Sequence, residues 1–152
     1  MYSYHVPPRK RPKNDDGYFE ILSQSVFQAG FSWDVVRNKW PNFRKAFCGF
    51  KISQVARLTS RDVGRLMRDP GIVRNSAKII AVIQNARTIE RIQREQGSFG
   101  NFIVSIRRRP YAKRRAILAK IFRWVGATGA YHFFWCVGEK VPEWVKRKSP
   151  YV

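Results

Sequence analysis

Apolar residues recur at the spacing of an α-helix from Tyr18 onward, and no segment has a convincing strand pattern. Proline, glycine and short polar clusters divide this pattern into separate helices. The predicted helices cover residues 18–28, 32–39, 51–57, 61–68, 75–96, 98–107, 110–123 and 127–137, with a short turn or helix after Pro142. The sequence therefore predicts an all-α protein.

The longest predicted helix, 75–96, has one apolar stripe and a charged remainder. The stripe consists of Ile79, Val82, Ile83, Ala86, Ile89 and Ile92. Lysine, arginine and glutamate occupy the rest of the circumference, as expected for a core helix with one face in solvent.

Composition divides the chain into three parts. Residues 1–16 contain three prolines and a basic cluster, which predicts an extended basic arm rather than a packed element. Residues 17–145 form a single predicted domain, and residues 146–152 a basic tail. With 44% hydrophobic residues and five tryptophans, the chain can bury one compact core. We expect it to be a monomer.

The two cysteines, Cys48 and Cys136, are too few for a disulfide scaffold. The sequence has no signal-peptide pattern and no apolar run that could span a bilayer. We therefore expect a cytoplasmic protein without membrane association, located at the nucleoid if the source is bacterial.

The charge is the strongest indication of a partner. Thirty lysines and arginines against ten acidic residues give a net charge of +20. A folded domain with this potential favours polyanions, nucleic acid first and anionic lipid second. Between Gln96 and Gly138 there is no acidic residue, and the cations are Arg107, Arg108, Arg109, Lys113, Arg114, Arg115, Lys120 and Arg123. This segment suits a phosphate backbone, with a solvated helix face as the alternative.

Residues 59–80 predict a helix, a tight turn and a second helix. Ser60 is a candidate N-cap of the first helix, Pro70 ends it, Gly71 allows a positive φ, and Asn75 or Ser76 can cap the second. Such a turn presents backbone N–H groups at a positive helix end, which suits a phosphate. It resembles the helix-hairpin-helix element, with an ordinary αα-hairpin as the alternative. The predicted DNA contacts here are Gly71, Ile72, Val73, Arg74, Asn75, Ser76 and Lys78.

The order of several short motifs resembles the 3-methyladenine DNA glycosylase I family, a branch of the helix-hairpin-helix DNA glycosylases. The motifs are Phe19-Glu20, the Q-A-G-x-S-W block from Gln28 to Trp33, Phe43-Arg44 with Ala46-Phe47, the block Gly71 to Arg74, Lys78-Ile79, Asn85-Ala86-Arg87, and Val125-Gly126 with Thr128. The resemblance extends over about residues 18 to 138.

The resemblance implies a helix-hairpin-helix glycosylase fold and base excision from damaged double-stranded DNA. A monofunctional enzyme of this kind flips out an alkylated purine and hydrolyses its N-glycosidic bond without a cofactor. Trp33 matches the family's base-stacking tryptophan, with core packing as the alternative role. Phe31 matches an apolar position that fills the gap left by the flipped nucleotide, and Tyr4 matches a tyrosine that reaches the base. Ser25 and Gln28 would line the base pocket.

One departure concerns catalysis. The family's base-contacting carboxylate lies three residues before the glutamine of Q-A-G, and that position is Ser25 here. A hydroxyl gives only a neutral contact, so a preference for 3-methyladenine is in doubt. Gln24, Gln28 and Ser25 could recognise another purine edge, Glu20 or Asp34 could approach from a neighbouring turn, or catalysis could be lost. The last case would make the chain a catalytically silent helix-hairpin-helix DNA-binding relative.

Other departures concern the metal and the nucleophile. The family's zinc ligands are missing, and we expect no metal, although His5, Cys48, His132 and Cys136 are an alternative tetrahedral set. The bifunctional branch of the superfamily uses a lysine nucleophile beside the hairpin and a nearby aspartate for its β-lyase step. Lys78 follows the hairpin here, but no Asp occurs downstream of it, which disfavours that step. An RNA-binding or membrane-surface protein would require the hairpin resemblance to be accidental.

Overall fold

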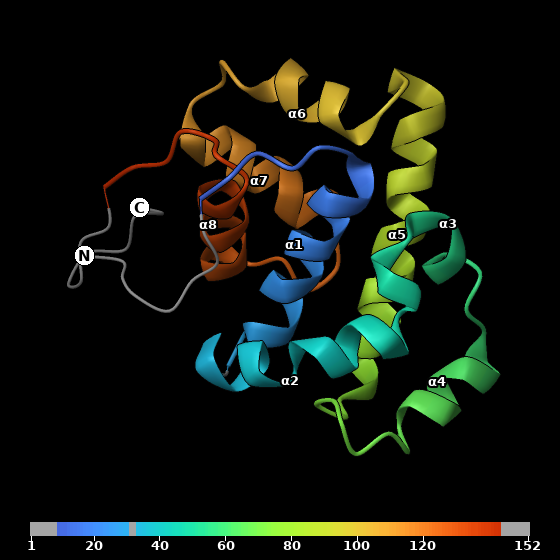
Figure 1. Ribbon diagram of the computed structural model, residues 1–152. Helices are drawn as coiled ribbons and strands as arrows, with labels where there is room; N and C mark the ends of the chain where they lie inside the picture. The colour runs from blue at the N-terminus through green and yellow to red at the C-terminus, as the bar shows by residue number, and fades with distance from the viewer. Residues whose placement is uncertain (1–8, 31–32, 144–152) are drawn as a thin grey trace.

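The computed structural model describes residues 9–30 and 33–143, and this part of the chain contains helices and no strands (Figure 1). The elements are α1 (Asp15–Gln28), α2 (Trp33–Ala46), the 3-10 turn η1 (Cys48–Phe50), α3 (Ile52–Val55), α4 (Ser60–Leu66), α5 (Ser76–Gln96), α6 (Phe99–Ile106), α7 (Tyr111–Ile121) and α8 (Ala127–Cys136). The all-α prediction is confirmed. None of the described helices has the length and apolarity needed to cross a bilayer.

Helix α1 runs through the middle of the molecule between α8 and α5 (Figure 1). It begins at Asp15, earlier than the predicted start at Tyr18, because the Asn14 side chain caps it by accepting a hydrogen bond from the Gly17 N–H at 2.9 Å. The Asp15 carboxylate accepts from the Phe99 and Gly100 N–H groups at 2.9 and 3.0 Å. The first turn of α1 therefore also caps α6.

Helix α2 continues to Ala46, although the prediction ended it at residue 39, before Pro41. Proline inside a helix costs about 3 kcal/mol because it removes a backbone hydrogen bond. On either side of Pro41, the rings of Trp40 and Phe43 are buried and stack with their centroids 5.0 Å apart. This aromatic packing offsets the lost hydrogen bond.

The core is rich in aromatic rings, and α5 supplies its aliphatic side. The whole predicted stripe of α5, from Ile79 to Ile92, is buried. Beside it, the rings of Phe27, Phe43 and Phe47 pack with centroids 4.5 to 6.4 Å apart. The core therefore fixes the ends of α1 and α5 relative to each other.

The segment before α1 is irregular but held against the end of α8. The Lys10 N–H donates to the Cys136 carbonyl at 2.9 Å, and the Arg9 guanidinium donates to the carbonyls of Trp135 and Glu139 at 2.6 and 2.8 Å. Residues 9–14 thus have fixed partners that an extended arm would lack. The boundaries 1–16, 17–145 and 146–152 stay predictions, and the turn or helix predicted after Pro142 lies outside the described residues, which end at Glu143.

Candidate nucleic-acid interface and base site

The hairpin between α4 and α5 has a defined cap at each helix start. Thr59, not Ser60, precedes α4, and its N–H donates to the Asp62 carboxylate at 2.7 Å. The predicted cap of α5 is confirmed at Asn75, whose side chain accepts from the Lys78 N–H at 3.1 Å. Arg74 and Ser76 beside this cap are exposed, whereas the Ile72 side chain is buried.

Gly71 is required for a reason other than the predicted one. Its φ does not lie in the left-handed region, which among the described glycines holds for Gly30, Gly49, Gly97 and Gly138. Its N–H donates to Asp69 at 2.8 Å, and its carbonyl accepts from the Asn42 amide at 3.2 Å. A Cβ at this position would lie 3.0 Å from Asn42 Cγ. The glycine therefore provides room for Asn42 of α2 against the hairpin.

Lys78 was predicted to contact DNA, but the structure buries its side chain at 2% exposure. The ammonium donates to the backbone carbonyl of Ala29 and, at 3.4 Å, to that of Phe27. Burial lowers the pKa of this ammonium. Lys78 thus joins the start of α5 to the end of α1, where α1 leaves carbonyls without helical partners. It does not project toward a phosphate.

Residues predicted to contact the base lie where α1 and α2 meet α8. Ser25 is fully buried and its hydroxyl donates to the Ile21 carbonyl at 3.1 Å. A Cβ built on Gly129 of α8 would lie 3.7 Å from the Ser25 Cβ. The Trp33 ring, 8% exposed, lies with its centroid 5.7 Å from that of His132, one turn further along α8.

Gln28 is also buried, in the last turn of α1. Phe31 and Tyr4, the other two predicted base contacts, lie outside the described residues, as does His5.

The polar residues considered as substitutes for a carboxylate at position 25 either have other partners or line a different groove. Glu20 accepts a hydrogen bond from the Trp40 indole at 2.8 Å and pairs with Arg44, while Asp34 pairs with Arg37 at 3.0 Å. Gln24 lines a groove of about 400 Å³ beside the segment 10–13, and its buried Oε1 has no hydrogen-bond partner. Neither carboxylate is therefore free to replace the carboxylate missing at residue 25.

His132 and Cys136 lie one turn apart on α8, with 3.7 Å between Nε2 and Sγ. Burial lowers the pKa of His132 to about 3 and raises that of the Cys136 thiol to about 12, so both groups are neutral at pH 7. Among the described residues no three His, Cys, Asp or Glu side chains gather as metal ligands would. A neutral imidazole therefore lies beside Trp33.

Known proteins resemble this chain in sequence and in fold. The family model described as methyladenine glycosylase matches residues 1–128. DNA-3-methyladenine glycosylase 1 of Escherichia coli K12 is 30% identical over 156 residues, which cover 90% of this chain and 83% of that protein. The chain belongs to the methyladenine glycosylase family. The DNA-3-methyladenine glycosylase of Haemophilus influenzae is 31% identical over 103 residues, covering 67% of this chain and 56% of that protein.

Two solved structures have the same fold as this family member. The Staphylococcus aureus 3-methyladenine DNA glycosylase I superposes with a TM-score of 0.80 at 23% identity, covering 89% of this chain and 82% of that chain. Another 3-methyladenine DNA glycosylase I structure gives a TM-score of 0.75 at 28% identity, covering 90% and 84%.

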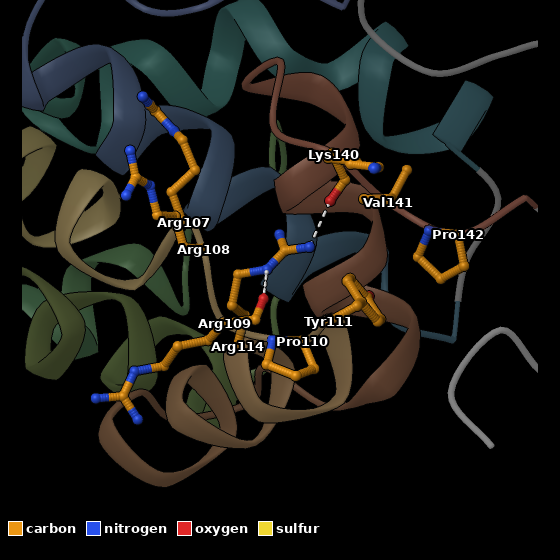
Figure 2. Close-up of a pocket in the computed structure, with 9 residues that line it drawn as sticks. All are labelled: Arg107, Arg108, Arg109, Pro110, Tyr111, Arg114, Lys140, Val141 and Pro142. Carbon is orange, nitrogen blue, oxygen red and sulfur yellow. Dashed lines mark hydrogen bonds between the residues drawn. The ribbon is translucent and has the colours of Figure 1, made fainter.

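In this member of the methyladenine glycosylase family, the basic segment after α6 divides into structural and exposed cations. Arg107 makes two 2.9 Å hydrogen bonds to Glu139, a carboxylate that is 2% exposed. Arg114, predicted to contact DNA, is buried and donates to the carbonyls of Arg109 and Lys140 at 3.1 and 2.8 Å (Figure 2). Both arginines therefore hold the protein together.

Arg108 and Arg109 are exposed and line an open cavity of about 490 Å³, and Lys113 is exposed in the first turn of α7. The α6–α7 connection that carries these arginines lies at the opposite end of the molecule from the α4–α5 hairpin (Figure 1). The two basic regions therefore lie apart in the fold (Figure 1).

The roles of two further residues were not predicted. Asn85 is 1% exposed and bonds the backbone of Arg123, and Trp124 beside it is half exposed. Asn85 follows Lys78 by seven residues, so both lie on the same side of the apolar stripe of α5. This spacing was the sequence signal for two buried polar residues.

Proposed function

We propose that this chain is a monofunctional DNA N-glycosylase that removes alkylated purine bases, 3-methyladenine or a close analogue, from double-stranded DNA. Its membership of the methyladenine glycosylase family supports the reaction class, because its named relatives are DNA-3-methyladenine glycosylases. The observation that carries the proposal is the buried Lys78, which ties the start of α5, directly after the candidate phosphate hairpin, to the end of α1, the helix that carries Ser25 and Gln28.

The hairpin is the proposed anchor for the DNA backbone. Its backbone N–H groups near the start of α5 suit a phosphate without base recognition, and Arg74 and Ser76 are exposed beside them. The net charge of +20 supports strong, salt-dependent binding to duplex DNA. Arg108, Arg109 and Lys113 would attract DNA over a distance rather than fix the lesion, because they lie at the other end of the molecule.

Trp33 is the proposed platform for the flipped base. An alkylated purine carries positive charge, and an indole face attracts a cationic ring by stacking and by cation–π contact worth about 0.5–2 kcal/mol. Ser25 and Gln28 approach the same junction from α1, and His132 approaches it from α8. Because His132 is neutral, it adds no repulsion toward a cationic base.

The chemistry requires little from an acid. The bond between the sugar C1′ and the alkylated purine breaks with its electron pair on the base, which leaves neutral. Water then adds to the cationic C1′ and releases a proton. Because the base is already a good leaving group, the protein must mainly extrude it, remove its water and hold the sugar in place. The Ser25 hydroxyl, which already donates to Ile21, is compatible with this modest role.

Release of free base from methylated DNA tests the proposal. Purified protein is incubated, without added metal or cofactor, with duplex DNA treated with a methylating agent, and the released bases are identified by chromatography. We expect 3-methyladenine or another methylated purine, and we expect Trp33→Ala to abolish its release while duplex binding persists. Binding to methylated DNA without release of any base would refute the glycosylase proposal.

A further inference from the structure

Trp124 is a large aromatic side chain that the fold leaves in solvent. It lies in the connection between α7 and α8, and 51% of it is exposed. The other large apolar residues exposed in the described structure, Val35, Ile80 and Val104, are aliphatic.

The backbone at Trp124 is in an unfavourable conformation. Its φ is 59°, in the left-handed region, where a bulky side chain is an outlier. Asn85 holds the backbone directly before Trp124. Its side chain accepts a hydrogen bond from the Arg123 N–H at 2.8 Å and donates one to the Arg123 carbonyl at 3.1 Å. Glycine would adopt this φ without strain. The positive φ of Trp124 therefore lowers the stability of the fold, and the half-exposed ring gains too little from burial to offset this cost.

Trp124 lies between the two halves of the proposed DNA site. The Lys78 ammonium, which is bonded to the end of α1, lies 5.7 Å from the centroid of the Trp124 ring. Lys78 also belongs to the first turn of α5, directly after the hairpin. The Trp124 carbonyl lies 4.0 Å from a Cβ built on Gly129, the residue that packs against Ser25. The exposed ring thus lies near the first turn of α5, and its backbone borders the turn of α8 that packs against Ser25.

We propose that Trp124 stacks on a nucleobase of the bound DNA and helps to hold the strand open at the lesion. This inference rests on the proposed function, since it gives that function a second aromatic contact besides Trp33. The occupant is a nucleobase because the surroundings are cationic: Arg123 is exposed next to the ring, and no acidic residue occurs between Gln96 and Gly138. Aromatic stacking of this kind tolerates any base and strengthens binding by roughly 5- to 100-fold.

A duplex with a tetrahydrofuran abasic site separates the contribution of Trp124 to binding from that of Trp33, because it offers no flipped base for Trp33 to stack on. The test compares wild type with Trp124→Gly and Trp124→Asn, two residues that tolerate a positive φ. Trp124→Phe keeps a stacking ring. Trp135→Phe removes a tryptophan that packs under Arg9, 4.5 Å from its guanidinium, and serves as the fluorescence control.

We expect the abasic duplex to quench tryptophan emission of wild type and of Trp135→Phe. Trp124→Gly and Trp124→Asn should lose most of this quenching and bind about tenfold more weakly. Trp124→Phe should bind within about threefold of wild type, because a phenyl ring still stacks. Melting temperatures of the glycine and asparagine variants, expected to equal or exceed that of wild type, confirm that they are folded.

The outcomes distinguish the two proposals. If wild type releases methylated bases but both non-aromatic variants bind and quench like wild type, the inference about Trp124 is wrong and the proposed function stands. If wild type neither binds the duplex nor releases a base, the proposed function is wrong and the role of Trp124 fails with it.

Discussion

The buried ammonium of Lys78 donates a hydrogen bond to the backbone carbonyl of Ala29, so that one side chain of α5 closes the end of α1. This contact joins the first turn of α5, directly after the hairpin, to the end of α1. The same ammonium lies 5.7 Å from the centroid of the Trp124 ring in the α7–α8 connection.

Replacement of Lys78 by methionine tests this structural role. The carbonyls of Ala29 and Phe27 would lose their donor, and an unsatisfied buried polar group costs about 1–3 kcal/mol. We expect the free energy of unfolding to fall by about this amount in urea titrations. Duplex affinity should fall too, with an unchanged slope of log affinity against log salt concentration. A slope reduced by about one, at unchanged stability, would instead identify Lys78 as a direct phosphate contact.

The contact between Gly71 and Asn42 predicts a compensating pair of substitutions. Gly71→Ala should weaken duplex binding, because the new Cβ would meet Asn42 Cγ at 3.0 Å and displace the hairpin. Asn42→Ala in the same chain should recover part of the loss, because it removes Cγ and Nδ2 and leaves only the Asn42 Cβ, at 3.1 Å, in close contact. Electrophoretic mobility shifts with the single and double variants measure this coupling. Equal affinities of Gly71→Ala and the double variant would contradict it.

Gly64 provides the matched control. It lies inside α4, and the nearest atom to a Cβ there is Arg68 Nη1 at 3.9 Å. Alanine should raise helix stability by up to about 1 kcal/mol without changing DNA affinity.

The separation of the two basic regions predicts unequal effects of single cations. Arg74→Ala, beside the hairpin, should weaken duplex binding and reduce the salt slope by about one. Arg108→Ala, at the α6–α7 end, should change equilibrium affinity for a short duplex little, although it is equally basic and exposed. Fluorescence anisotropy at several salt concentrations measures both. A larger effect of Arg108 than of Arg74 would place the DNA at the other end of the molecule.

His132 predicts how stability changes with pH. Burial lowers its pKa in the folded protein from the ordinary value of 6.5 to about 3, so below pH 6.5 the unfolded chain binds a proton that the folded chain does not. Stability should therefore fall as the pH drops from about 6.5 toward about 3, by at most about 1.4 kcal/mol per pH unit from this group.

Asparagine at position 132 removes this titration. The difference in unfolding free energy between wild type and His132→Asn should therefore shrink as the pH is lowered from 7 to 5. A constant difference over this range would mean that His132 titrates normally in the folded protein.

Much of the fold could be predicted from the sequence because it depends on local signals. The apolar stripe of α5 and its cap at Asn75 were both found in this way. The extent of α2 could not be predicted, because Pro41 is a local stop signal that aromatic stacking across it overrides. The capping pair of Thr59 and Asp62 was a readable signal, and the choice of Ser60 overlooked it.

The candidate site was predicted in part. The motif around Trp33 indicated a base site near the start of α2. Lys78 and Arg114 were predicted to contact DNA, because the sequence gives the charge of a side chain but not its burial. The exposure of Trp124 and its positive φ depend on Asn85, a long-range contact without a local pattern. For Trp33 the structure gives the position, nearly buried beside His132, and its role as the base platform stays a prediction.

The single-turnover rate of base release by wild type and by Trp33→Ala, measured on duplex DNA with a 3-methyladenine, tests the central claim most directly. The account predicts that wild type releases the free base, and that Trp33→Ala slows release by at least about 100-fold while duplex affinity changes less than about threefold, because stacking acts on the flipped base. Equal rates for the two proteins, or no release by wild type, would contradict it.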